Sequence, residues 1–145
     1  MKEVKIVKPQ GEHFLGIISL LRQLWKDKVL NERRLGEVFE SGLSNDLQEF
    51  RIAMCNDRIV GFASLTIKNS LWQGGYLAHI DELVVDERFR GKGVGTRLLD
   101  EMIKVSKKRS CKKIELDSAF HRKRAHIFYE SKGFKNRAFI LSKDL

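Results

Sequence analysis

The sequence predicts an α/β protein of the α+β type, in which a mixed, mostly antiparallel central sheet of about 6–7 strands is flanked by about four helices. Strand-like and helix-like segments follow one another in the order β-α-α-β-β-β-α-β-α-β. Three successive strands joined by short loops favour an antiparallel meander, whereas the later β-α-β crossover favours a parallel pair. Because 145 residues suffice for one core and no linker or repeat interrupts them, residues 1–145 are expected to form a single domain.

A strand and two helices are predicted in the first third of the chain. Residues 3–8 alternate apolar and charged side chains and lead to the only proline, as a short strand does. The next segment places apolar side chains on one helical face, at Phe14, Ile17, Ile18, Leu21, Leu24 and Trp25. Asn31 is a suitable N-cap for a second helix, which Gly42 would end. The inward side chains of that helix are expected to be Leu35, Val38 and Phe39.

Two strands and a loop follow. Residues 50–55 and 58–68 are rich in strand-forming side chains and are joined by a tight turn at Asn56-Asp57. The loop over residues 69–75 carries Trp72, which would either wall an acceptor pocket or lie at a subunit contact.

The second half of the chain continues the alternation of strands and helices. The predicted elements are a strand ending at Val85, a helix from Val94 to about Lys108, a strand over 112–118, a helix around 122–132 and a last strand over 138–142. Gly133 directly follows the helix predicted around 122–132 and is expected to be its C′ residue. A seventh strand would be missing, short, or supplied by a partner chain.

The segment Arg90-Gly91-Lys92-Gly93-Val94-Gly95 joins a strand to a strongly amphipathic helix. Glycines at such a junction lack a Cβ, so successive backbone N–H groups can point at one anion, and the positive end of the helix dipole lies behind them. Arg90, Lys92 and Arg97 add positive charge, and no acidic residue lies in the first helical turn. The segment is therefore predicted to bind a pyrophosphate.

Residue spacing excludes two common phosphate-binding loops. A P-loop requires a Gly-Lys pair followed by Ser or Thr, whereas Lys92 is followed by Gly93. The dinucleotide fingerprint Gly-x-Gly-x-x-Gly, counted from Gly91, requires glycine where Thr96 stands. That fingerprint would also follow the first strand of a Rossmann fold, and here the loop comes much later in the chain.

The remaining pattern, Arg-x-x-Gly-x-Gly at Arg90, Gly93 and Gly95, resembles the acyl-CoA-binding signature of the GNAT superfamily of N-acetyltransferases. Residues 125–134 (AHIFYESKGF) resemble the closing motif of that family, in which an aromatic-Tyr pair is followed by Gly-Phe. Residues 79–86 resemble the strand that precedes the loop in small-amine and amino-sugar acetyltransferases. The element order matches the GNAT fold across essentially the whole chain.

The resemblance implies acetyl-CoA as co-substrate and an amine as acceptor. If the strand before the loop bulges or splays, its backbone amides would donate hydrogen bonds to the thioester oxygen. The same strand would pair with the pantetheine arm through main-chain hydrogen bonds. The implied cofactor-binding residues are Leu83, Val84, Val85, Arg90, Gly91, Lys92, Gly93, Val94, Gly95, Thr96, Arg122 and Tyr129. Arg122 stands where many relatives have an asparagine that touches the pantetheine arm. Arg122 would meet a CoA phosphate instead, or the contact would be absent.

The resemblance also suggests catalytic roles. Tyr129 matches the tyrosine that commonly protonates the departing thiolate in this family. Glu82 would lie beside the acetyl group and act as base through water, while strict strand alternation would point Asp81 to the opposite face unless a bulge intervenes. His79 would share the face of Asp81 and serve as a structural histidine with satisfied hydrogen bonds. A base is unnecessary if the site selects the neutral amine.

Composition indicates the expected cellular location and partners of the protein. No apolar run is long enough to cross a membrane, and the two cysteines form no metal-ligand or disulfide pattern, so a cytoplasmic location without a metal is expected. The net charge of +9 suits the phosphates of coenzyme A, and no nucleic-acid-binding motif accompanies it. Acetyl-CoA and an amine are therefore the expected partners, together with a possible homodimer.

The identity of the acceptor amine is left open by the sequence. A small molecule is expected, and Arg33 and Arg34 suggest that it is anionic. The alternatives are a peptide or protein amine, and a non-catalytic acyl-CoA-binding regulatory module.

Overall fold

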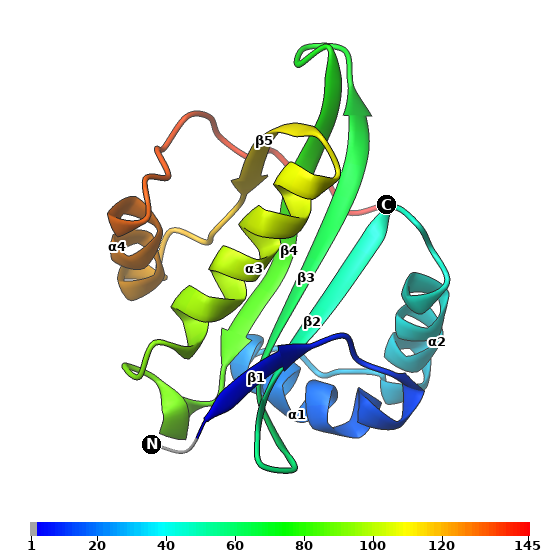
Figure 1. Cartoon of the computed structure of the whole chain (residues 1–145). Helices are drawn as coiled ribbons and strands as arrows, with labels where there is room; N and C mark the ends of the chain where they lie inside the picture. Colours follow the sequence, from blue (N-terminus) through cyan, green and yellow to red (C-terminus); the bar gives the residue numbers. More distant parts are fainter. Residues whose placement is uncertain (1–2) are drawn as a thin grey trace.

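Five strands form one sheet in the order β1-β2-β3-β4-β5 in the computed structural model, which describes residues 3–145 (Figure 1). The strands are β1 (Val4–Val7), β2 (Gln48–Cys55), β3 (Arg58–Ser70), β4 (Gly75–Val85) and β5 (Cys111–Leu116). Neighbouring strands are antiparallel except for β4 and β5, which are parallel. The predicted mixed, mostly antiparallel sheet is confirmed.

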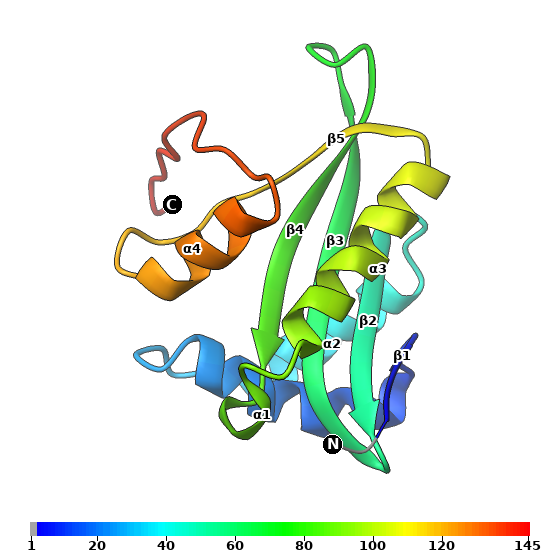
Figure 2. The ribbon, with the colours of Figure 1, turned by 60° about the vertical axis from the view of Figure 1, so that its left-hand side comes forward.

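Four α-helices cover the two faces of the sheet, as predicted. They are α1 (Phe14–Leu24), α2 (Glu32–Leu43), α3 (Val94–Lys108) and α4 (Lys123–Ser131), with short 3-10 turns at Gly11–His13 and Glu87–Phe89. The apolar stripe of α3 packs on one face in a core that includes Leu65 and Ile80, whereas α1 and α2 pack on the other face around Ile52 and Phe62. Figure 2 shows α3 and α1 on these opposite sides.

The α2 helix begins where predicted, but the stripe of apolar side chains through which it packs is narrower than predicted. The Asn31 side chain accepts a hydrogen bond from the Arg34 N–H at 3.1 Å, which confirms the predicted N-cap. Phe39 is buried and Leu35 is half-buried. Val38 is 64% exposed, so the prediction that it faces inward is wrong, because the helix meets the sheet through the face that carries Phe39.

The predicted last strand over 138–142 does not form. The chain beyond α4 has no regular secondary structure, and the described sheet therefore has five strands rather than the expected 6–7. Phe139 and Leu141 have the side chains of a strand but are 83% and 93% exposed. A strand requires a neighbouring edge for its backbone hydrogen bonds, and this segment has no such pairing in the described chain.

The β4 and β5 strands separate halfway along β4. Their pairing runs from Tyr76 opposite Cys111 to Ile80 opposite Leu116, and beyond Ile80 only β3 pairs with β4. Figure 2 shows β5 and the segment after it leaving β4 and running toward α4. We call this separation the fork, and it positions the site described next.

Candidate active site

A cleft of about 240 Å³ lies at the fork between β4 and β5. Its walls are formed by the second half of β4, the segment after β5, α4 and the residues that end α1. Both predicted catalytic residues, Glu82 and Tyr129, line it, together with Asp117, Arg122 and Trp25. The fold thus brings Glu82 and Tyr129 into one cavity from elements that are distant in sequence.

A β-bulge places Asp81 and Glu82 on the same face of the sheet. The register between β3 and β4 shifts beside Ser64, which leaves Asp81 as the extra residue of β4. Ser64 and Thr66 share a face of β3, and their hydroxyls donate hydrogen bonds to Glu82 Oε1 and Asp81 Oδ2, each at 2.5 Å. The strict alternation that would point Asp81 away from Glu82 is therefore wrong, because the bulge adds one residue.

The environment of Glu82 raises the pKa of its carboxyl above that of an exposed glutamate. Burial raises the pKa of the Glu82 carboxyl and the charge of Asp81 adds to this, whereas the hydrogen bond from Ser64 lowers it, with a net upward shift. The Ser64 hydroxyl also accepts from the Glu82 backbone N–H at 2.9 Å. Glu82 is therefore a stronger base than an exposed glutamate when it is ionised, and it is held in one orientation.

His79 contacts two carboxylates at the fork. Its Nδ1 lies 2.9 Å from Asp81 Oδ1, and its Nε2 lies 2.9 Å from Asp117 Oδ1. The hydrogen bond to Asp81 is the largest cause of a raised His79 pKa, against the opposing effect of burial. Both ring nitrogens have partners, as expected of a structural histidine.

Tyr129 enters the cleft from α4. Its ring makes edge contacts with Phe128 and Phe134, at centroid distances of 5.3 and 5.7 Å. Burial raises the pKa of the phenol to about 12, although the charge of Arg122 opposes the shift. Tyr129 is therefore protonated at neutral pH and can act as a proton donor.

The end of α4 secures the aromatic cluster around Tyr129. Gly133 has a φ of +91°, and its N–H donates to Glu130 O at 3.0 Å, as the predicted C′ glycine should. The N–H of Phe134 donates to Tyr129 O at 3.0 Å, which returns the Phe134 side chain to the cluster.

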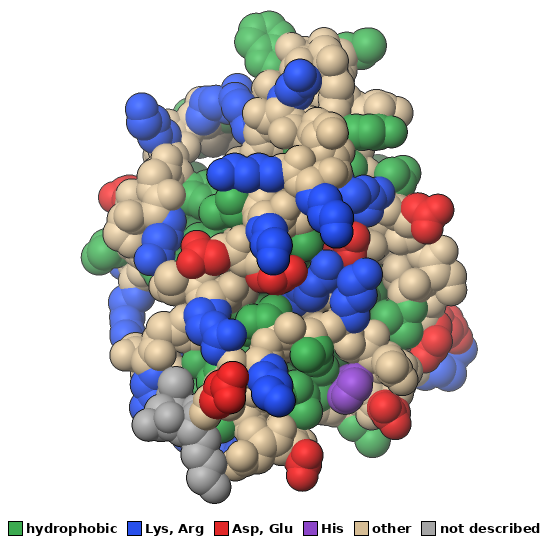
Figure 3. All heavy atoms as spheres, in the orientation of Figure 1, with side chains coloured by type: hydrophobic (Ala, Val, Ile, Leu, Met, Phe, Trp, Pro, Cys, Tyr) green, Lys and Arg blue, Asp and Glu red, His purple; other side chains and the backbone are tan. Residues whose placement is uncertain are grey.

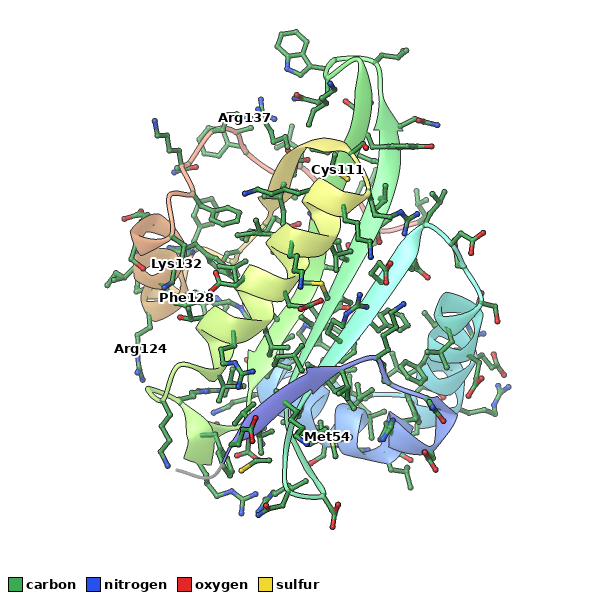
Figure 4. All side chains as sticks on the ribbon, in the orientation of Figure 1. Met54, Cys111, Arg124, Phe128, Lys132 and Arg137 are labelled. Carbon is green, nitrogen blue, oxygen red and sulfur yellow. The ribbon has the colours of Figure 1, made fainter. Side chains whose placement is uncertain are left out.

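The glycine loop leads directly into α3, as predicted. Gly91 and Gly93 have φ values of +74° and +86°, and Gly93 is the N-cap of α3. A Cβ built on Gly95 would lie 3.6 Å from Val85 Cγ2 and 3.7 Å from Phe128 Cζ. Phe128 lies on the side of α4 that faces α3, whereas Arg124 extends away from it (Figure 4). The loop, the end of β4 and the helix that carries Tyr129 therefore meet at Gly95.

The basic side chains near the loop have different partners. Arg90 Nε donates to Val85 O at 3.1 Å, and Lys92 Nζ lies 5.4 Å from the centroid of the Phe89 ring. The Arg97 guanidinium donates to Val4 O on β1 and thus points away from the loop, contrary to its expected contribution there. Arg90 and Lys92 are the basic side chains that remain beside the glycines.

Arg122 lies in the cleft and is fixed to α1. Its Nη2 donates to Leu24 O at 2.8 Å, so it binds one of the last carbonyls of α1. The structure thus places Arg122 beside the cleft, at the start of α4. Its predicted contact with the cofactor stays a prediction.

Sequence reasoning missed the partners of the predicted residues. Ser64 and Thr66 read as ordinary strand residues, and only the three-dimensional register brings them to Glu82 and Asp81. Asp117 had a usable signal, because it directly follows a strand of a parallel pair and ligands bind at the carboxyl ends of such strands. Trp72 lies at the tip of the β3–β4 hairpin, 84% exposed and outside the cleft.

A second hollow, of about 340 Å³, lies beside α3 and β1. Of the residues predicted to serve the site, it contains Arg97 and none of the predicted catalytic residues. Within residues 3–145, no group of three His, Cys, Asp or Glu side chains is arranged to hold a metal ion. In the same range, no helix is long and apolar enough to cross a membrane. Figure 3 shows Lys and Arg side chains spread over the α3 face, with Asp and Glu between them.

Comparison with known proteins agrees with this geometry. The chain is 39% identical over 89 residues to a glucosamine 6-phosphate N-acetyltransferase of Trypanosoma brucei brucei. The aligned segment covers 61% of this chain and 58% of that protein. It is 28% identical over 130 residues to an aminoalkylphosphonate N-acetyltransferase of Salmonella typhimurium. That aligned segment covers 90% of this chain and 84% of the relative. The crystal structure of glucosamine-6-phosphate N-acetyltransferase from Arabidopsis thaliana superposes with a TM-score of 0.83 at 28% identity, covering 99% of both chains.

The family assignment rests on a match that includes every residue of the candidate site. The model of the acetyltransferase (GNAT) family matches residues 16–134, which include most of α1, all of α2, the sheet from β2 to β5, the glycine loop and α4. The chain therefore belongs to the acetyltransferase (GNAT) family and is an acyltransferase.

Proposed function

We propose that the protein transfers the acetyl group of acetyl-CoA directly to the primary amine of a small molecule, with both substrates bound together. The observation that carries this proposal is the cleft at the fork, which contains a half-buried carboxyl with a raised pKa and a protonated tyrosine. A base for the amine and an acid for the thiolate are the two proton-transfer groups that the reaction uses.

The glycine loop and the free half of β4 fit acetyl-CoA. A Cβ built on Gly91 or Gly93 would meet no atom within 4 Å, so the space in front of the loop is open. The first N–H groups of α3 have no intrahelical acceptor, and no acidic side chain lies in that turn. Leu83–Val85 pair only with β3 in the described sheet, so an extended arm with amide groups can add to their other edge, except at Val85 O, which already accepts from Arg90 Nε. These residues would hold the diphosphate and the pantetheine arm.

Proton transfers in the cleft follow from the two titratable groups. Acetyl-CoA, when bound, supplies the thioester whose carbon the amine attacks. An alkylammonium ion has a pKa of about 10, so Glu82 accepts its proton through a water molecule. The Tyr129 hydroxyl donates a proton to the sulfur that leaves. Backbone N–H groups on the free edge of Leu83–Val85 would donate hydrogen bonds to the oxyanion that forms.

A small acceptor is favoured by the size of the cleft and by the named relatives. A cleft of about 240 Å³ lies just below the usual range for small-molecule sites, about 300–1,000 Å³, so a sugar-sized molecule suits it. The named relatives act on glucosamine 6-phosphate and on aminoalkylphosphonates, and both acceptors are amines that carry a phosphorus oxyanion. Arg33 is already paired with Glu37 at 2.8 Å, so Arg34 is the better candidate of the two for an anionic acceptor. The expected cytoplasmic location and homodimer stay predictions.

Saturable 1:1 binding of acetyl-CoA is the first expected result. Calorimetric titration of the purified protein at moderate salt measures it directly. Thiol release is then followed with glucosamine 6-phosphate, 2-aminoethylphosphonate, glucosamine and a short peptide with a free amino terminus. Faster release with the two phosphorus-containing amines supports the proposal. Preference for the peptide would favour the alternative of a peptide acetyltransferase, and binding without release from any amine would favour a regulatory module.

The Glu82→Gln variant is expected to lower kcat/KM at neutral pH by about 10²-fold, because it removes the base while keeping the shape of the side chain. In the wild type, activity should fall as the pH drops through the raised pKa of Glu82, since protonated Glu82 accepts no proton. The variant should lack that acid limb. The pH profile of kcat/KM measures both effects, and Glu40→Gln on the exposed surface of α2 is the control. An unchanged acid limb in Glu82→Gln would show that another group is the base.

A further inference from the structure

His79 joins the two strands at the fork. It precedes Ile80, the last residue of β4 that pairs with β5, and Asp117 is the first residue after β5. Its ring therefore spans from the β4 wall of the cleft, at Asp81, to the opposite wall, at Asp117, with both contacts at 2.9 Å. We call these three residues the clasp.

The clasp holds its two carboxylates unequally. Asp81 also accepts the Thr66 hydroxyl at 2.5 Å, and its side chain is 29% exposed. The Asp117 side chain is 52% exposed, and its carboxylate forms a hydrogen bond with His79. Loss of the imidazole would therefore release the Asp117 wall far more than the Asp81 wall.

The imidazole can satisfy both carboxylates only in its protonated form. Neutral imidazole has one N–H, whereas imidazolium donates from both nitrogens. The acidic groups around it are Asp81 and Glu82 on β4 and Asp117 after β5. Glu115 lies opposite His79 in the register of β5, where Arg137 is its partner at 3.5 Å. Tyr129 and Arg122 line the same cleft from α4 and its start.

We propose that His79 is a positioning residue for acetyl transfer, which sets the distance between the Glu82 and Tyr129 walls of the cleft by holding Asp117 against β4. The segment that Asp117 begins leads directly into α4, which carries Tyr129, so its position determines where the proton donor lies. This inference rests on the proposed function, because the role is defined by transfer. Acetyl-CoA binding at the glycine loop does not depend on the clasp.

The test compares His79→Gln and Asp117→Asn with wild type in calorimetry and in thiol release with glucosamine 6-phosphate. Glutamine cannot bridge both carboxylates, so His79→Gln is expected to lower kcat by at least about 10-fold, while Kd for acetyl-CoA changes less than about two-fold. Asp117→Asn keeps the size of the side chain and removes one charge, and a smaller fall in kcat is expected. His13→Gln, at a histidine in the 3-10 turn before α1, is the control.

The pH profile separates positioning from a general effect on folding. Above the His79 pKa the imidazole becomes neutral and the clasp opens, so kcat of the wild type should decline on the alkaline side. Asp117→Asn removes a carboxylate that raises this pKa, so the decline should move to lower pH. Asp117 is half-exposed, so Asp117→Asn is expected to fold even if His79→Gln does not.

Each outcome has one meaning. Wild-type kcat in both variants, or equal losses of kcat and acetyl-CoA affinity, would overturn the positioning role. An alkaline limb that stays in place in Asp117→Asn would overturn it as well. Absence of transfer by the wild type itself, with acetyl-CoA bound, would overturn the proposed function on which this inference rests.

Discussion

Gly93→Asp is expected to abolish acetyl-CoA binding. Gly93 is the N-cap of α3, and its Cβ would project into open space in front of the helix, where the diphosphate is proposed to lie. A carboxylate there would repel the diphosphate and compete for the N–H groups of the first turn. Calorimetric titration with acetyl-CoA should show no saturable binding.

Gly74→Asp is the matched control for this variant. Gly74 also has a positive φ, +66°, and a Cβ on it would also meet no atom within 4 Å. Both substitutions therefore impose a similar left-handed strain, roughly 1–2 kcal/mol, but Gly74 lies at the β3–β4 hairpin tip. Gly74→Asp should bind acetyl-CoA like the wild type. Wild-type affinity in Gly93→Asp would refute the assignment of the loop, and lost affinity in both would indicate misfolding.

Tyr129→Phe is expected to lower kcat by about 10²-fold while leaving Kd for acetyl-CoA almost unchanged. The substitution removes only the hydroxyl, and the ring contacts with Phe128 and Phe134 remain. Since the pKa of Tyr129 is raised to about 12, the wild-type phenol is protonated at every pH at which the reaction would be assayed. Steady-state kinetics and calorimetry on the same preparation measure the two quantities.

Tyr76→Phe tests whether loss of any tyrosine hydroxyl has this effect. Tyr76 lies at the start of β4, is 40% exposed and is outside the cleft. The Tyr76→Phe variant should retain wild-type kcat. Equal losses of kcat and affinity in Tyr129→Phe would identify Tyr129 as a packing residue and not as the proton donor.

Local patterns predicted most of the fold because they act over short distances. The Asn31 cap, the C′ glycine at Gly133 and the apolar stripe of α3 each depend on residues within a few turns, and each is found in the structure. The glycine loop was also predictable, since left-handed φ values at Gly91 and Gly93 are those that glycine adopts without cost.

Features that depend on pairing between distant segments were not predictable. The bulge at Asp81 depends on how β3 and β4 align, and strand alternation alone predicts the wrong face for that residue. The segment over 138–142 has the side chains of a strand, but strand formation requires an edge that the pattern does not reveal. His79 and Asp117 are 38 residues apart, and only the parallel pairing of β4 with β5 brings them together.

The burial of Glu82 also affects the stability of the fold. A carboxyl with a raised pKa in the folded state favours the unfolded chain once it ionises, because the unfolded chain ionises it more easily. This cost is absent below the pKa of Glu82 in the unfolded chain and complete above its higher pKa in the folded protein. At neutral pH the protein is therefore less stable than it would be if the pKa of Glu82 were the same in the folded and unfolded states. The residue proposed to make the site reactive also lowers the protein's stability.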